Sequence, residues 1–167
     1  MLKILKEKSS PRALFTDILP LKSLLTSNIE SNPGLWICPY NNLSLEGVIV
    51  NQDKDPEDFL KSFELESVSG VIYTPPFSTK QVSEYLTKRG KTVSRWDTSP
   101  LFWSTQKDII SKILKPNGVC ITVAWNSSGL GSSRGFKQEE ILLLSLGGLH
   151  NDNIITVERK IPRNSLF

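Results

Sequence analysis

The stretch "STQKDIISKILKPNGVCITVAW", residues 104–125, decides the fold class of this chain. Ser104 is a residue type that caps helices, and four apolar residues between 109 and 114 recur at helical spacing after it. Pro116-Asn117-Gly118 then favours a helix end, and the apolar run "VCITVAW" follows. A continuous run of this kind is typical of a central parallel strand that is buried on both faces. The stretch therefore predicts a helix that leads into a central strand.

The same alternation of helix and strand extends toward the N-terminus. Because strands that alternate with helices form parallel sheets, the chain is predicted to be an α/β protein with a doubly wound, mostly parallel sheet and helices on both faces. The predicted elements are a helix over 17–34, strands over 35–38 and 47–50, a helix over 56–64, a strand over 70–73 and a helix over 78–89.

The C-terminal part changes character. The runs "EEILLLSL" (139–146) and "NIITVERK" (153–160) read as strands, and "GGLHND" between them contains the glycines and Asn/Asp residues of a tight reversal. These features predict an antiparallel hairpin that closes the sheet. His150 lies in the reversal, where a hydrogen bond within the turn is favoured over a catalytic role.

Length and composition favour one globular domain over residues 1–167, because 38% of the residues are hydrophobic and 22% are charged. The net charge of +3 permits an anionic partner but falls short of the strongly basic surface of a typical nucleic-acid-binding domain. Residues 1–14 are predicted to be a basic N-terminal arm, either a solvated tail or a short docking helix.

Cys38 and Cys120 both lie in apolar, strand-like runs, where a free thiol acts as a small hydrophobic group. Two such cysteines form neither a disulfide framework nor a zinc site. No apolar stretch approaches the ~18 residues that span a bilayer. We therefore expect a cytoplasmic protein with reduced thiols, located in the host cell if the gene is viral, and no membrane partner.

The segment "GVIYTPPFS", residues 70–78, runs an apolar strand into two prolines. Neither proline can donate to a sheet ladder, and each fixes its own φ, so the backbone after Tyr73 leaves the sheet in a stiff, extended form. Such stiffness would hold carbonyl oxygens and the Phe77 ring still against a flat ligand. A plain strand exit is the other interpretation of the same residues.

Residues 53–78, "DKDPEDFLKSFELESVSGVIYTPPFS", resemble a stretch of the amino-methyltransferases, which methylate the exocyclic amine of adenine or cytosine in DNA. In that family an acidic residue, a helix with Phe-Leu-Lys, an apolar strand and then Pro-Pro with an aromatic residue follow in this order. Residues 101–160 are similar to small methyltransferase-like proteins of phages, prophages and archaea. The matching motifs are Trp125-Asn126-Ser127, Gly129-Leu130-Gly131, Arg134-Gly135-Phe136 and the run from Gly147 to Asp152.

The resemblance implies a Rossmann-like fold, S-adenosylmethionine (SAM) as cofactor, and catalytic roles for Thr74, Pro75, Pro76 and Phe77. In the family, the first loop residue and the carbonyl of the first proline accept hydrogen bonds from the target amine. The aromatic residue stacks on a base that is flipped out of its helix. Methyl transfer then depends on positioning and charge stabilisation more than on a strong base.

The resemblance also implies the binding residues. Pro39 and Tyr40 stand where the family has Asp-Pro-Phe, and Asp53 or Asp55 would approach the ribose hydroxyls or adenine amine of the cofactor, unless they only cap a helix. For the substrate, the implied residues are Trp125, Asn126 and Arg134, the last of them on a phosphate. The alternatives are a core tryptophan, a turn asparagine and a solvated arginine.

Two departures from the family pattern leave two functions open. Thr74 stands in place of Asp or Asn and supplies no negative charge, and Cys38 replaces the acid of the cofactor motif. The first function is a SAM-dependent methyltransferase that acts on an exocyclic base amine, with DNA as the expected nucleic acid. Because duplex readout needs an additional element, either a protein partner supplies target recognition or none is needed. The second function is an inactive homologue that serves as a scaffold or nucleic-acid-binding subunit.

Overall fold

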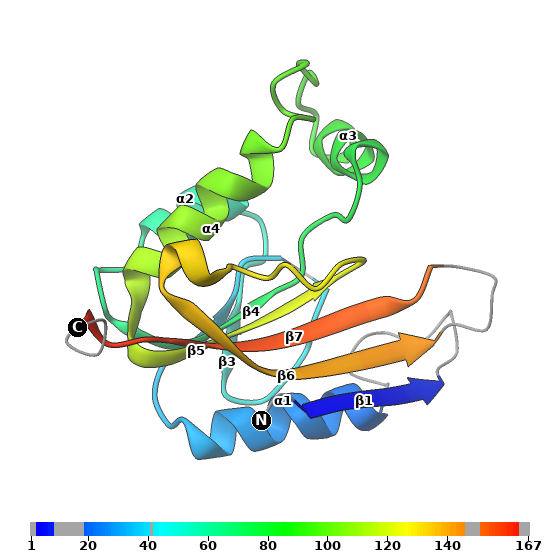
Figure 1. The fold of residues 1–167 in the computed structure, drawn as a ribbon. Coiled ribbons are helices and arrows are strands. Elements are labelled where there is room, and N and C mark those ends of the chain that lie inside the picture. Colours follow the sequence, from blue (N-terminus) through cyan, green and yellow to red (C-terminus); the bar gives the residue numbers. More distant parts are fainter. Residues whose placement is uncertain (1–2, 9–18, 41, 146–150, 164–167) are drawn as a thin grey trace.

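The computed structural model describes residues 3–8, 19–40, 42–145 and 151–163. Within these ranges, seven strands form one sheet in the order β1-β6-β7-β5-β4-β2-β3 (Figure 1). The strands are β1 (Lys3–Lys8), β2 (Trp36–Cys38), β3 (Val48–Val50), β4 (Val68–Tyr73), β5 (Leu114–Ala124), β6 (Phe136–Ser145) and β7 (Asn153–Lys160). The helices are α1 (Leu19–Ser31), α2 (Pro56–Lys61), α3 (Thr79–Lys88), α4 (Leu101–Ile113) and the short 3-10 helix η2 (Ser132–Arg134).

The sheet is parallel from β3 through β2 and β4 to β5, and β7 runs antiparallel to both β5 and β6. Residues 118–123 of β5 are all buried. A strand that is buried along consecutive residues is covered on both faces, which is the position of a central strand. The predicted fold class is confirmed, as is the antiparallel pairing of the two C-terminal strands. Most of the reversal between them, including His150, lies outside the described residues.

Helices cover both faces of the sheet (Figure 1). On one face, α1 contributes Leu21, Leu24 and Leu25 to a core that includes Ile121 of β5. On the other face, α2 and α4 pack against Cys120, the preceding residue of β5, through the residues Phe59, Leu60, Ile110 and Ile113. Successive residues of β5 therefore face different helices, as the alternation of side chains along a strand requires.

The sequence predicted Ser104 as the N-cap of this helix. Helix α4 instead begins at Leu101, three residues earlier, so that prediction is wrong. Pro100 stands at the helix start, where a missing N–H costs nothing, and Ser104 lies inside the helix with its hydroxyl bonded to Arg134. The tripeptide 116–118 does not separate helix from strand either. Leu114 already pairs with Val68, and the sheet register then shifts, so the tripeptide forms an irregularity within β5.

The N-terminal residues also differ from the prediction. Residues 3–8 form strand β1, which pairs in parallel with β6 from Glu140 to Ser145, instead of a loose arm or docking helix. Without β1, strand β6 would present an unpaired row of N–H and C=O groups at the edge of the sheet. The remainder of the predicted arm lies outside the described residues.

Both cysteines are free and fully buried, on opposite faces of the sheet, which confirms their role as small hydrophobic groups. Burial raises the pKa of Cys38 to about 11 and that of Cys120 further, so both remain neutral thiols. In the described part of the chain, no helix is both long and apolar enough to cross a bilayer.

The contact between Gly70 of β4 and Trp36 of β2 gives a stability test. A Cβ at position 70 would overlap the fused rings of Trp36, which is fully buried. We expect Gly70→Ala to lower the free energy of unfolding by about 3 kcal/mol, the upper range for overpacking, in urea denaturation. In the Trp36→Phe background the same change should cost less, because the smaller ring leaves room for the methyl group. Equal costs in both backgrounds would contradict this contact.

Candidate functional site

Residues 74–77 form a loop, which we call the diproline loop, at the carboxyl end of β4 between the sheet and α3. Thr74 is only 2% exposed. Its hydroxyl donates to Oδ1 of Asn42 at 2.5 Å, and its carbonyl accepts from Nδ2 of the same side chain at 3.1 Å. Asn42 therefore holds the hydroxyl and the carbonyl of Thr74. The hydroxyl proton is used, and the hydroxyl oxygen keeps its capacity to accept.

Two helices hold the other end of the diproline loop. The N–H of Phe77 donates to Oε1 of Gln81 on α3 at 2.6 Å, and the Pro76 carbonyl accepts from Nε1 of Trp103 on α4 at 2.8 Å. Ser78 caps α3 immediately afterwards. The backbone that follows β4 is thus fixed by two prolines and by side chains from three different segments.

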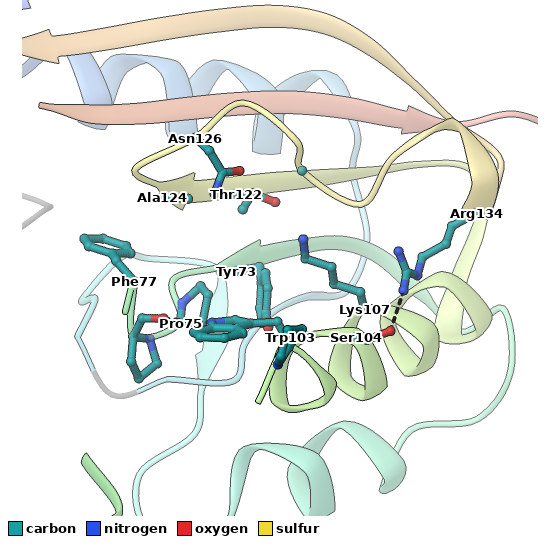
Figure 2. A pocket seen from close by; sticks show the side chains of 13 residues that line it. Tyr73, Pro75, Phe77, Trp103, Ser104, Lys107, Thr122, Ala124, Asn126 and Arg134 are labelled. Atoms are coloured by element: carbon teal, nitrogen blue, oxygen red, sulfur yellow. Dashed lines mark hydrogen bonds between the residues drawn. The ribbon is translucent and has the colours of Figure 1, made fainter. Parts of the chain in front are cut away.

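The diproline loop separates two cavities, and Pro75, Pro76 and Phe77 line both of them. We call the first, of about 350 Å³, the α4 cavity (Figure 2). Its other walls include Tyr73, Trp103, Lys107, Thr122, Asn126 and Arg134. We call the second, of about 450 Å³, the α3 cavity. Its other walls include Tyr40, Asn42, Thr74, Glu84, Tyr85 and Arg89. Both open at the sheet edge where parallel α/β folds bind ligands.

Pro39 and Tyr40, predicted to contact a cofactor, follow β2 and are buried. The Tyr40 hydroxyl donates to Oε1 of Gln106 at 2.7 Å, and the Tyr73 hydroxyl donates to the same oxygen at 3.1 Å. Burial raises the pKa of Tyr40 well above its ordinary value. Its hydroxyl is therefore committed to the core, and only its ring is available to the α3 cavity.

Asp53 and Asp55 are not brought to the diproline loop. Asp53 is exposed, and Asp55 caps α2 and forms an ion pair of 2.5 Å with Lys91. Partial burial acts to raise the pKa of Asp55, but the Lys91 bond and backbone N–H groups outweigh it and lower the pKa. The end of β3 instead carries Asn51, which is buried and donates to the carbonyls of Pro39 and Lys54. Neither aspartate lines the α3 or the α4 cavity.

Trp125 and Asn126 do reach the diproline loop from the end of β5. The Trp125 ring lies 5.4 Å from the Phe77 ring, centroid to centroid, with a tilt of 49°. Trp125 is 37% exposed, so it is not a core tryptophan. Asn126 lines the α4 cavity, and its Oδ1 accepts from the backbone N–H and the hydroxyl of Ser128. The structure thus places Trp125 and Asn126, at the end of β5, next to the diproline loop.

Arg134 lines the α4 cavity but is already engaged. Its guanidinium donates to Oδ1 of Asp108 at 2.6 Å and to the Leu130 carbonyl at 3.2 Å. It also donates to the Ser104 hydroxyl at 3.0 Å (Figure 2). These bonds fasten η2 to α4. Arg134 is therefore neither a solvated arginine nor a free phosphate ligand.

Sequence reasoning missed Trp103 and Lys107, which α4 directs into the α4 cavity one turn apart. Lys107 is half-buried, and burial together with the charge of Arg134 lowers its pKa. Their spacing of four was visible in the sequence. The sequence of a helix, however, does not determine which of its faces borders a cavity.

Glu158 of β7 was also missed. It is 1% exposed and accepts from the N–H groups of Leu130 and Gly131 at 2.6 and 3.0 Å. Gly129 has a φ of 50°, and a Cβ there would overlap the Glu158 carboxylate, so glycine is required. Glu158 therefore holds the segment that carries Asn126 and Arg134 against the sheet.

No protein-family model and no curated protein sequence matches this chain. Among solved structures, methyltransferases are similar to this chain at low identity. One is a Thermus thermophilus protein provisionally described as a DNA modification methylase, with 13% identity, a TM-score of 0.44 and coverage of 78% of this chain and 54% of that one. This chain therefore spans about half its length.

Two further similar structures contain bound ligands. The 1,6-didemethyltoxoflavin-N1-methyltransferase of Burkholderia thailandensis, bound to S-adenosylhomocysteine, is 9% identical with a TM-score of 0.44, covering 86% of this chain and 77% of that one. NSun6 of Pyrococcus horikoshii, with SFG, is 12% identical with a TM-score of 0.45, covering 96% and 48%. All three TM-scores lie below 0.5, so they assign no activity to this chain.

The environment of Glu158 predicts a pH dependence of stability. Burial raises its pKa in the folded state, although the two N–H groups act in the opposite direction. A raised pKa stabilises the fold most below the unfolded value of about 4.3, and this contribution is lost as the pH rises through the folded value. Relative to Glu158→Gln, the wild type should therefore lose unfolding free energy as the pH rises above the unfolded value.

Urea denaturation at a series of pH values measures this difference. Glu64→Gln, at an exposed position, is the matched control and should show no comparable trend. A difference between wild type and Glu158→Gln that stays flat, or that grows with pH, would show that ionised Glu158 is well accommodated.

Proposed function

We propose that this protein is a SAM-dependent methyltransferase that acts on an exocyclic amine of a nucleic-acid base, adenine N6 or cytosine N4, with DNA as the expected polymer. The observation that carries the proposal is the rigid diproline loop with a cavity on each side. One cavity suits a flat acceptor and the other suits the cofactor, so the loop would border both reactants, and the amine and the methyl group would meet at its edge.

The α4 cavity supports the acceptor side of the proposal. Its volume of about 350 Å³ falls within the range of small-molecule sites, roughly 300 to 1,000 Å³. Phe77 and Trp103 provide aromatic surfaces, and Trp125 supports the Phe77 ring from outside. Aromatic side chains bind any base through its π face, which suits a base that has left its stack.

The diproline loop also offers hydrogen-bond acceptors to an amine. No donor among the described residues reaches the Pro75 carbonyl, whereas the Pro76 carbonyl is occupied by Trp103. Thr74 lines the α3 cavity, and its oxygen can accept a second bond because Asn42 takes only its proton, so it would meet an amine that reaches past the loop toward the cofactor. Two acceptors held without reorganisation would orient the lone pair of the amine nitrogen. The nitrogen would later release a proton to water, since the loop holds no strong base.

The residues of the α3 cavity fit SAM in their chemistry. When bound, SAM supplies a methyl group activated by a sulfonium centre. Glu84 offers a carboxylate to an ammonium group, and Lys88 and Arg89 offer cations to a carboxylate. The rings of Tyr40 and Tyr85 meet edge to face at 5.6 Å and give the cavity an apolar wall. Asp53 and Asp55 take no part in this assignment because they lie elsewhere.

The catalytically inactive homologue, as a scaffold or nucleic-acid-binding subunit, remains the second candidate because of Cys38. Its thiol replaces the family's acid, is fully buried, and donates to the Tyr40 carbonyl at 3.1 Å. With its pKa raised by burial, Cys38 supplies no charge. Within 42–50, which carries the chain toward β3, no helix forms to present backbone N–H groups to a cofactor.

The first test concerns the aromatic wall. Phe77→Ala should weaken binding of deoxyadenosine or deoxycytidine about 10- to 100-fold, because stacking contributes about 1–3 kcal/mol per base. Calorimetry with S-adenosylhomocysteine present measures the affinity. Trp96→Ala removes an aromatic ring that is 76% exposed and outside both cavities, so it should leave nucleoside binding unchanged. Equal losses in both variants would contradict a base site at Phe77.

The second test separates the two candidate functions. Thr74→Asp places a carboxylate beside the position of the developing ammonium, so an active enzyme should gain about tenfold in methyl-transfer rate. Thr74→Asn is the neutral control and should gain less. Transfer of radiolabelled methyl from SAM gives the rate, and calorimetry gives cofactor affinity. Absence of SAM binding in the wild type and in Thr74→Asp would reject the enzyme and leave the inactive homologue.

A further inference from the structure

Lys107 stands out in the α4 cavity because it has no counter-ion. Among the described residues, no carboxylate lies within ion-pair distance of its ammonium, although the side chain is half-buried. The two nearby acids are already engaged. Asp108 pairs with Arg134, and Glu158 is bound by two backbone N–H groups.

The surroundings of Lys107 disfavour its charged form when the cavity holds no ligand. Burial and the neighbouring Arg134 both lower its pKa, and Glu158 acts in the other direction. A cation that is removed from water is normally paired, because lost hydration must be replaced by an opposite charge or by acceptors. The cavity therefore has a place for an anion next to Lys107.

The walls of the α4 cavity are divided by chemistry (Figure 2). Pro75 and Phe77 lie at one end, Arg134 lies at the other, and Lys107 points into the space between Tyr73 and Arg134. A ligand that matches both ends has a planar ring and, at some distance from it, an anionic group. A nucleotide has this form, with its base and its phosphate separated by the sugar.

We propose that the α4 cavity binds the phosphate of the nucleotide whose base it accepts, with Lys107 as the phosphate ligand. The substrate class is then a nucleoside phosphate, either a free mononucleotide or one nucleotide of a strand. The proposal rests on the proposed function for the identity of the ring. The ammonium of Lys107 donates to a phosphate oxygen, and Arg134 adds positive potential while it stays bonded to Asp108.

Binding measurements test the phosphate contact. Deoxyadenosine and deoxycytidine are compared with their 5′-monophosphates by calorimetry, with S-adenosylhomocysteine present. The monophosphates should bind the wild type about tenfold more tightly, as expected for one charge-assisted hydrogen bond. Lys107→Met should abolish this gain, and Lys107→Arg should retain it. Lys112→Met removes an exposed lysine of the same helix and should leave the gain intact.

A trinucleotide distinguishes the two sources of the phosphate. If the trinucleotide binds more tightly than the monophosphates, the substrate is a strand, and the reverse order indicates a free nucleotide. Both outcomes support a phosphate site at Lys107. Equal affinity of nucleosides and monophosphates for the wild type, or a gain that survives in Lys107→Met, would overturn it.

A measurement on the wild type alone separates this proposal from the proposed function. Limited acetylation with mass spectrometry reports how reactive Lys107 is, with Lys112 as the internal reference. The monophosphates should slow acetylation of Lys107 severalfold, as direct occupation of its ammonium requires, even if no methyl is transferred and no SAM binds. Unchanged reactivity of Lys107 at saturating monophosphate would overturn the phosphate site whatever the fate of the methyltransferase assignment.

Discussion

Strand β4 lies between two parallel neighbours and must end where Pro75 and Pro76 remove the donors that its ladder needs. The chain therefore leaves the sheet at its carboxyl edge. Because the two prolines also fix the direction of exit, space remains on both sides of the loop. The two cavities follow from this constraint, as does the exposure of the Phe77 ring to each of them.

Prolines alone would give a stiff loop without a defined position. The position of the loop is set by hydrogen bonds to side chains of three other segments. These are Asn42 after β2, Gln81 on α3 and Trp103 on α4. Each bond is made by a group that is at least partly shielded from water, where an unmade bond is costly. The result resembles the preorganised sites of enzymes, in which acceptors are aimed before the substrate arrives. A binding protein that holds a flat ligand without chemistry uses fixed acceptors in the same way.

The opposite wall of the α4 cavity is held by charge. Glu158 accepts hydrogen bonds from the segment around Gly129, and Arg134 pairs with Asp108. Lys107 has no ion-pair partner among the described residues. These groups come from β7, η2 and α4, which are distant in sequence. Their arrangement places positive potential at one end of a cavity whose other end is aromatic. A ligand that fits this cavity has a flat ring and a negative charge.

The sequence by itself determined the α/β class, the central place of β5, the antiparallel C-terminal pair and the diproline exit, because each follows from local periodicity or from the geometry of proline. It misplaced the start of α4 and missed the N-terminal strand, whose partner β6 lies more than a hundred residues away in the chain. Only the tertiary structure decided which polar residues meet. Asn42, Trp103 and Lys107 carry no motif, whereas Asp53 and Asp55, which did fit one, lie away from the loop. The reason is physical: a side chain's chemistry is written in the sequence, but its partners and its exposure depend on how separate elements pack.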